Sequence, residues 1–316
     1  MAEAKEFNFS TYLREETEKV RETYYPVRAT RLTCLMKKTE KPGKLHPNPD
    51  DEFCFPDIGP NNSIIAKYEA GFREIMGQGT GQFDTTGANE PIMVQKARPD
   101  GFLIMNGHHR WAAALKMKVP KVKIEIVNVT QLSDIREMLA KSRSDKRVTV
   151  DLDEVVFARG GDGVPLEKPM PFPLRGRFRE RVRRGIPALF HMLSDKGYDI
   201  WVYTSGYYSI KYIRHYFRMW DVKLTGAVTG MGGKNGRRLS DEREMKKMLD
   251  TQYRATLHID KDLVIRTFSG SKECDEYPLS GSPDSWVREA TDALEKMAKA
   301  DEKKALAAAA KQKAEA

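Results

Sequence analysis

Acidic and hydroxyl side chains follow three short apolar runs in the second half of the chain. The runs are VTV before Asp151 and Asp153, IWVY before Thr204, and TLHI before Asp260 and Asp262. Short β-rich runs that alternate with helical patterns predict the strands of a parallel sheet. The carboxyl ends of such strands line one crevice, where ligands bind. We therefore expect carboxylates from two of these runs and the hydroxyl of Thr204 to converge at that edge.

This grouping is chemically suited to phosphoryl transfer, the reaction that the family resemblance given next implies. Several carboxylates together suit Mg²⁺, a hard cation that prefers oxygen ligands. A carboxylate can also attack phosphorus to give an aspartyl-phosphate. Phosphoryl transfer depends mainly on positioning and charge neutralisation, which a metal site beside a nucleophile can provide.

The three strand ends resemble the motifs of the haloacid dehalogenase (HAD) superfamily of phosphotransferases. In that superfamily an apolar strand precedes DxDx(T/V), a second strand ends in Thr or Ser, and a last strand ends in acidic residues. VTVDLDEVV, WVYTSG and LHIDKD are similar to these motifs, and the resemblance covers about residues 147–295. It implies a Rossmannoid domain with a doubly wound parallel sheet and the activity of a phosphatase, a phosphoric monoester hydrolase.

The resemblance also implies a role for each matching residue. Asp151 is the nucleophile and a metal ligand. Asp153 protonates the leaving group, later activates water, and adds its main-chain carbonyl to the metal. Thr204 donates to the phosphoryl oxygens, and Asp260, with Asp262, anchors Mg²⁺.

The HAD superfamily also needs a lysine that neutralises the phosphoryl group. Lys234, in GMGGKNGRR, sits best for this role, and Lys246 and Lys247 are less suitable because they lie inside a predicted helix. The last motif departs from the usual spacing, since Lys261 separates its two acidic residues.

A second group of chemically capable residues lies in the first half, in GFLIMNGHHRWAAALKM. The pattern predicts a strand, a turn at Gly107 and a helix that begins at His108 and His109. Free amides and the helix dipole make a helix N-terminus an anion site. Arg110 adds a forked and permanently charged donor. We expect these four residues to bind phosphate or a nucleotide.

This segment resembles the ParB/sulfiredoxin superfamily, whose members bind nucleotide phosphates with a Gly-x-(His/Arg)-Arg loop. The resemblance covers about residues 28–127 and implies an α+β domain that binds ATP or another nucleoside triphosphate. Sulfiredoxins carry a catalytic Cys where this chain has His108, so sulfinic-acid repair is not expected.

The free-serine kinases of the ParB/sulfiredoxin superfamily carry an Asp-Gly-His-His-Arg loop, and Asn106 replaces that Asp here. A kinase also needs an acidic base, for which the sequence offers Asp51, Glu52 and Asp57 without choosing among them. A kinase, an NTPase and a plain binding module therefore stay open.

Six arginines lie in PLRGRFRERVRRG, between the first and second motifs. One interpretation is a cradle for a polyanionic substrate such as a nucleic acid end. The other is a solvated face of a helix predicted over residues 179–196, with Phe178 and Val182 facing the core. Under the first interpretation, the substrate-binding residues are Arg175, Arg177 and Arg179.

The bulk properties set the outline. The 316 residues predict two domains, which we place at 1–145 and 146–298, followed by an Ala/Lys-rich solvated tail over 299–316. The net charge of +9 favours anionic partners. No apolar run reaches the length of a membrane span, no secretory signal is visible, and three scattered cysteines suit a reducing cytoplasm. The oligomeric state is not indicated.

Together these features predict a two-domain, Mg²⁺-dependent phosphotransfer enzyme. A phosphomonoesterase follows a nucleotide-binding domain and acts on a nucleic acid end or a small phosphorylated metabolite. The alternative is a ParB-like nucleic-acid-binding protein with a catalytically inactive HAD-like scaffold. A third possibility is a nucleotide sensor without turnover.

Overall fold

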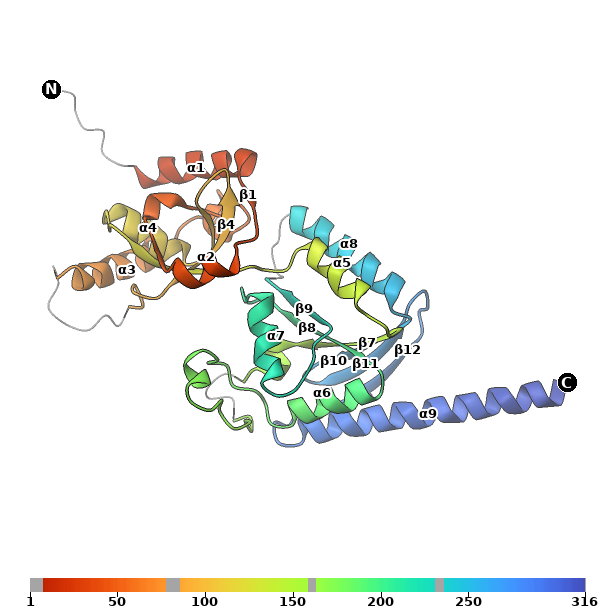
Figure 1. Ribbon diagram of the computed structural model, residues 1–316. Helices are drawn as coiled ribbons and strands as arrows, with labels where there is room; N and C mark the ends of the chain where they lie inside the picture. The colour runs from red at the N-terminus through yellow and green to blue at the C-terminus, as the bar shows by residue number, and fades with distance from the viewer. Residues whose placement is uncertain (1–7, 78–85, 159–162, 231–235, 316) are drawn as a thin grey trace, which may run out of the picture. The chain divides into compact units, whose positions relative to one another are not determined.

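The computed structural model describes residues 8–77, 86–158, 163–230 and 236–315 (Figure 1). The chain divides into two compact units, one mainly up to Val129 and the other mainly from Thr130. The sequence placed this boundary near residue 146. Residues 130–140 group with the second unit because Thr130 bonds to its sheet: the Thr229 amide donates to the Thr130 hydroxyl at 2.9 Å, and that hydroxyl donates to the Ala227 carbonyl at 3.1 Å.

The first unit contains a mixed six-stranded sheet. Its strands are β1 (Tyr25–Pro26), β2 (Thr39–Glu40), β3 (Leu45–His46), β4 (Ile92–Arg98), β5 (Phe102–Asn106) and β6 (Val122–Ile126). The order is β2-β6-β4-β5-β3, with β1 paired to β4. The pairs β4–β6 and β3–β5 are parallel and the others antiparallel. The fold is therefore mixed α/β here, as the sequence predicted.

The helices of the first unit are α1 (Phe9–Thr23), α2 (Arg31–Met36), α3 (Asn62–Ile75) and α4 (His108–Lys116), with short 3₁₀ turns η1 (Pro42–Lys44) and η2 (Glu52–Cys54). Helix α3 begins where the Asn61 side chain accepts hydrogen bonds from the amides of Ser63 and Ile64. Trp111 of α4 is fully buried, and its indole donates to the Pro42 carbonyl at 3.0 Å. This contact fixes α4 in the core of the unit.

The second unit also contains a six-stranded sheet. Its strands are β7 (Lys146–Asp151), β8 (Asp199–Thr204), β9 (Gly226–Thr229), β10 (Ala255–Ile259), β11 (Leu263–Phe268) and β12 (Cys274–Pro278), in the order β12-β11-β10-β7-β8-β9. Strands β10, β7, β8 and β9 are parallel, whereas β11 and β12 are antiparallel. The prediction of a parallel sheet therefore holds for four strands and is wrong at the edge formed by β11 and β12. The chain reverses directly after β10, where the Asp260 amide donates to the Leu263 carbonyl at 2.9 Å.

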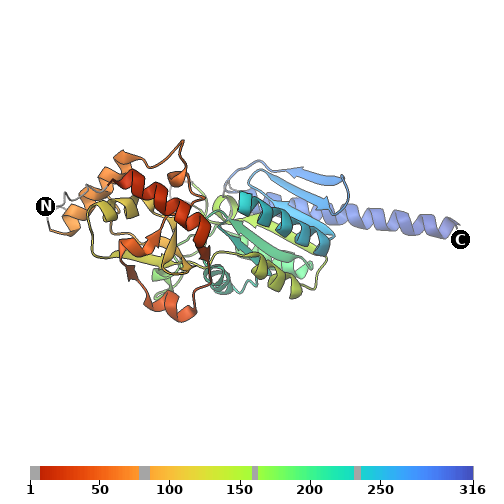
Figure 2. The same ribbon diagram turned by 90° about the horizontal axis from the view of Figure 1, so that it is seen from above.

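Helices lie on both faces of this second sheet (Figures 1 and 2). They are α5 (Leu132–Ala140), α6 (Ile186–Asp195), α7 (Ile210–Arg218), α8 (Gly236–Gln252) and α9 (Trp286–Glu315), with a π-type turn η3 (Leu152–Val156) and a 3₁₀ turn η4 (Leu174–Gly176). Helices α5 and α8 lie on one face, and α6, α7 and α9 on the other. In the parts of the chain that the structure describes, no helix is both long and apolar enough to cross a bilayer.

The helix predicted over residues 179–196 starts later than expected. Helix α6 begins at Ile186, after Gly185, whose φ of 87° interrupts the regular backbone. Val182 instead forms an antiparallel bridge with Phe157. Phe178 and Val182 are both buried, so the sequence identified the right core residues but assigned them to the wrong element.

The predicted tail over residues 299–316 continues the helix that precedes it, since α9 runs on to Glu315. Arg266 of β11 ties the middle of this helix to the sheet. Its guanidinium donates to both carboxylate oxygens of Asp301, at 2.6 and 2.9 Å, and also to Asp275.

Candidate functional sites

The second sheet brings three of the predicted residues to one edge. Strand β7 lies between β10 and β8, and all three run parallel. Asp151 is paired in register with Tyr203, and Val150 with Ile259. Asp151 therefore ends the central strand. Thr204 directly follows Tyr203 on one side, and Asp260 directly follows Ile259 on the other. This is the convergence that the alternating pattern predicted.

Asp151 caps the turn that follows its own strand. One of its carboxylate oxygens accepts hydrogen bonds from the amides of Asp153, at 2.6 Å, and Glu154, at 2.8 Å. Burial raises the pKa of Asp151, the two amides oppose this, and the charges of Asp153 and Glu154 add to it. The η3 turn thus holds the carboxylate in place at the strand end.

The Asp153 carboxylate is held by the end of β8. The Thr204 hydroxyl donates to it at 2.9 Å, and the Ser205 amide and hydroxyl each donate to it at 2.9 Å. Thr204 is almost fully buried, whereas Ser205 is exposed. The sequence assigned Thr204 to phosphoryl oxygens and did not assign Ser205. Ser205 follows Thr204 directly in the T-S-G turn, and this position at the strand end is the sequence feature that could have identified it.

Asp260 and Asp262 lie in the tight turn between β10 and β11 and not within a strand. The indole of Trp286, which is fully buried, donates to the Lys261 carbonyl at 2.9 Å and so fixes this turn. Burial raises the pKa of Asp260, and the charges of Asp262 and then Asp151 raise it further. The carboxylates of Asp151 and Asp260 are therefore close enough to repel each other electrostatically.

Charge compensation at the strand ends is sparse. Over the described residues, neither Asp151 nor Asp260 forms an ion pair with a lysine or arginine. Over the same residues, no three His, Cys, Asp or Glu side chains are already grouped as a metal cluster. Lys234 lies outside the described residues. Lys246 and Lys247 line a separate hollow on α8 with Arg243, Thr251 and Ser269.

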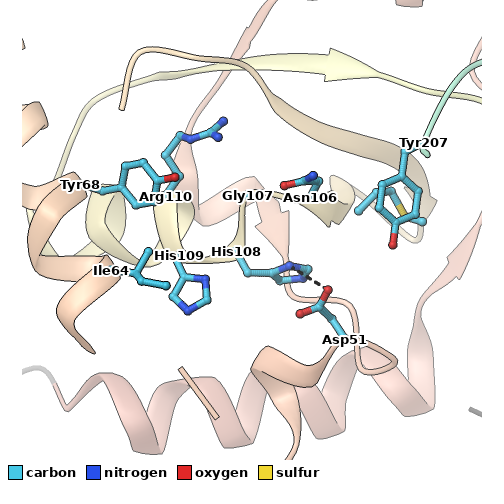
Figure 3. A pocket seen from close by; sticks show the side chains of 10 residues that line it. Asp51, Ile64, Tyr68, Asn106, Gly107, His108, His109, Arg110 and Tyr207 are labelled. Atoms are coloured by element: carbon cyan, nitrogen blue, oxygen red, sulfur yellow. Dashed lines mark ion pairs between the residues drawn. The ribbon is translucent and has the colours of Figure 1, made fainter. Parts of the chain in front are cut away.

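The loop before α4 lines a pocket of about 390 Å³ in the first unit (Figure 3). Gly107 has a φ of 101°, in the left-handed region that favours glycine, and no side chain caps the helix that follows. The pocket walls include Asp51, Ile64, Tyr68, Met105, Asn106, Gly107, His108, His109, Arg110 and Tyr207. The predicted group of four residues therefore does line one pocket.

The protonation pattern of the two histidines follows from their hydrogen bonds. The Asn48 amide donates to Nε2 of His108 at 3.2 Å, and the Asn61 amide donates to Nε2 of His109 at 3.0 Å. Nε2 is thus the acceptor in each ring, and Nδ1 carries the hydrogen. Burial lowers the pKa of His108 to about 4 and also lowers the pKa of His109. Both rings are therefore neutral at pH 7.

Asp51 is the upstream acid that the structure places in this pocket. Oδ1 of Asp51 accepts from the Phe53 amide at 3.0 Å, and Oδ2 lies 3.5 Å from Nδ1 of His108 (Figure 3). Glu52 and Asp57, the other two acids that the sequence offered, are not among the pocket walls. Of the three acids, the structure therefore places only Asp51 on the wall of this pocket.

Arg110 lines the pocket, but its guanidinium forms hydrogen bonds with backbone groups of the same unit. Its guanidinium donates to the carbonyls of Glu90, at 3.1 Å, and Pro91, at 2.8 Å, and lies over the ring of Tyr68. The Glu90 carboxylate is 3.3 Å away. Arg110 therefore anchors the segment before β4 to α4, a contact that the motif alone did not indicate.

The arginines assigned to substrate lie in the segment between η3 and α6. Arg175, Arg177 and Arg179 are exposed, whereas Arg183 is buried, with its guanidinium over the ring of Trp286. The run is therefore divided between a solvent-facing part and a structural part.

The comparisons with known proteins bear on the Gly107 loop of the first unit. The ParB N-terminal domain family matches residues 74–143, a range that includes β4, β5, α4, β6 and α5. No curated protein matches the chain. The match covers less than half of the chain and includes the Gly107 loop, so this part of the protein is similar to a ParB N-terminal domain.

Proposed function

We propose that the second unit is a Mg²⁺-dependent phosphomonoesterase of the HAD type, with Asp151 as its nucleophile. The observation that carries the proposal is the arrival of Asp151, Thr204 and Asp260 at one edge of three parallel strands. Asp153 lies beside them, oriented by Thr204 and Ser205. Ligands bind at this edge of open α/β sheets.

The proposed reaction has two steps, which use Asp151 and Asp153. In the first, a carboxylate oxygen of Asp151 attacks phosphorus, the bond to the leaving oxygen breaks, and Asp153 gives that oxygen a proton. In the second, Asp153 takes a proton from water, which attacks the aspartyl-phosphate and releases inorganic phosphate. The side chain of Asp151 then returns to its starting state.

The strand ends suit a divalent cation. Two partly buried carboxylates, Asp151 and Asp260, lie within electrostatic reach of each other, and burial and neighbouring charges raise the pKa of both. Mg²⁺ would be held by these two side chains, with the main-chain carbonyl of Asp153 and the carboxylate of Asp262 as further oxygen donors. When bound, it would neutralise charge on the phosphoryl oxygens.

Hydrolysis of p-nitrophenyl phosphate, with and without Mg²⁺, tests this proposal. Asp151→Asn should lower kcat by about 10³-fold or more, since it removes the nucleophile. Asp195→Asn is the matched control, because Asp195 is an exposed acid at the end of α6. Equal hydrolysis by the wild type and the Asp151 variant, or no hydrolysis of any phosphoester in a panel, contradicts the proposal.

For the first unit we propose binding of a nucleoside triphosphate, ATP or another, at the Gly107 loop. The uncapped N-terminus of α4 and the Nδ1–H of His109 supply donors for phosphate oxygens. If this unit is also a kinase, Asp51 is the base that accepts the hydroxyl proton of the substrate. Asp51→Asn should then abolish product formation while nucleotide binding persists. Binding without any product in the wild type would identify a binding module.

The similarity to the ParB N-terminal domain supports a second candidate function, nucleic-acid binding with a catalytically inactive second unit. The net charge of +9 agrees with such a partner. This function predicts affinity for DNA or RNA that falls steeply as salt rises, together with no phosphatase activity.

A further inference from the structure

An exposed aromatic side chain marks the segment of residues 163–185, which precedes α6. Phe172 is 94% exposed, more than any other large apolar side chain in the described part of the chain. Its neighbour in the same segment, Phe178, is buried against Tyr212 and Tyr216. The segment therefore has a packed base and an unpacked aromatic tip.

Every exposed charged side chain among residues 163–185 is basic. Arg175, Arg177 and Arg179 are exposed. The two acids among residues 163–185 are partly buried: Glu167 accepts a hydrogen bond from the Gly185 amide at 2.7 Å, and Glu180 accepts one from the Tyr212 hydroxyl. The exposed surface beside Phe172 is thus rich in cationic donors.

The C-terminal end of this segment is fixed next to the strand end that carries Asp151. Phe157 and Val182 form an antiparallel bridge, and the Arg183 amide donates to the Val156 carbonyl at 2.9 Å. The buried guanidinium of Arg183 donates to the Val155 carbonyl at 3.1 Å. Because η3 starts directly after Asp151, these bonds attach the segment to the turn beside the proposed nucleophile.

We propose that this segment binds single-stranded nucleic acid, with Phe172 stacked on a base and Arg175, Arg177 and Arg179 on the phosphates. The proposal rests on the phosphatase function above and names its substrate class, a phosphorylated nucleic acid end. Stacking on an aromatic ring combined with a basic track is how proteins bind single strands without sequence preference. A base paired within a duplex offers no free face to Phe172, so single strands are preferred.

Two readouts test the proposal. The first is the fluorescence anisotropy of a short labelled oligothymidylate, phosphorylated at its 3′ or its 5′ end, in the Asp151→Asn background where no turnover occurs. The second is kcat/KM for the unlabelled oligonucleotide and for p-nitrophenyl phosphate with Asp151 intact. The variants are Phe172→Ala and the double change Arg175→Ala/Arg177→Ala. The control is Arg243→Ala, which removes an exposed arginine from α8 of the same unit.

Phe172→Ala should weaken oligonucleotide binding by about fivefold to a hundredfold, the range found when a stacking aromatic is removed. Its loss of kcat/KM should be at least about fivefold larger on the oligonucleotide than on p-nitrophenyl phosphate. Unchanged binding in Phe172→Ala and in the double variant overturns the proposal, as does an equal loss in Arg243→Ala. If binding depends on Phe172 but the wild type hydrolyses no phosphoester, the phosphatase function fails and the binding surface stands.

Discussion

Acidification should destabilise the first unit, because His108 is buried there as a neutral ring. Burial lowers the pKa of His108 in the folded chain to about 4, while an exposed histidine in the unfolded chain titrates near 6.5. Between these two values the unfolded chain binds a proton that the folded chain does not. Stability is therefore complete above about pH 6.5 and falls progressively toward pH 4.

The size of the effect follows from the two pKa values. At about pH 5, protonation of this histidine in the unfolded chain raises the equilibrium constant of unfolding by about 1.5 log units. This corresponds to a loss of about 2 kcal/mol relative to about pH 8. His109, whose pKa is also lowered but which is more exposed, changes stability in the same direction.

Amide hydrogen exchange of peptides from α4 measures this loss locally, after correction for the pH dependence of intrinsic exchange. A local measurement is needed because burial also lowers the pKa of His258 in the second unit. His108→Gln keeps an acceptor for the Asn48 amide but does not titrate, so its α4 protection should lose about 2 kcal/mol less over the same pH range. Parallel pH profiles of the wild type and this variant would refute the assignment of a buried neutral ring.

Three further substitutions test the packing around the sites. Gly226→Ala should destabilise the second unit by about 1–3 kcal/mol, as measured by denaturant unfolding, because a Cβ there would lie 2.1 Å from the ring of Trp201. Arg266→Met should cost roughly 1–3 kcal/mol and speed amide exchange in α9 near Asp301, since it removes charge-assisted hydrogen bonds. Gly107→Ala should cost about 1–2 kcal/mol in the first unit because its φ is 101°.

Matched changes separate these effects from general disturbance. A Cβ at Gly176 would meet no atom within 4 Å, so Gly176→Ala should be neutral within about 0.5 kcal/mol. Arg243→Met removes an exposed arginine from the same unit as Arg266 and should not change exchange in α9. A loss in Gly176→Ala as large as that in Gly226→Ala would contradict the steric explanation.

The alternating pattern of the second half predicted β7, β8 and β10, three of the four parallel strands, because each is a short apolar run that ends in polar residues. It did not reveal β9, β11 or β12. The run after Asp262 is short and mostly apolar. Its pairing with β10 depends on a reversal of the chain at Asp260, and the charged residues there do not predict a turn. The helix before Lys196 was extended too far because an arginine-rich run resembles a helix face, although Gly185 ends that pattern.

The site residues divide in the same way. Asp151, Thr204 and Asp260 were predictable because a strand end is a local feature and parallel strands bring their ends together. The bond between Thr204 and Asp153 was not, because it depends on how η3 turns after β7. Arg110 shows the same limit, since its partners Glu90 and Pro91 lie twenty and nineteen residues earlier in the chain.

Asp51 shows most clearly why tertiary structure was needed. The sequence offered three acids of similar type within seven residues, and nothing in their spacing favours one of them. The choice comes from His108, which reaches Asp51 from α4 with its Nδ1 because the Asn48 amide occupies its Nε2. A backbone amide thus sets the tautomer of the ring, and the ring in turn faces one carboxylate in the pocket. Any role of Asp51 as a base therefore depends on the same neutral histidine that we expect to make the first unit sensitive to acid.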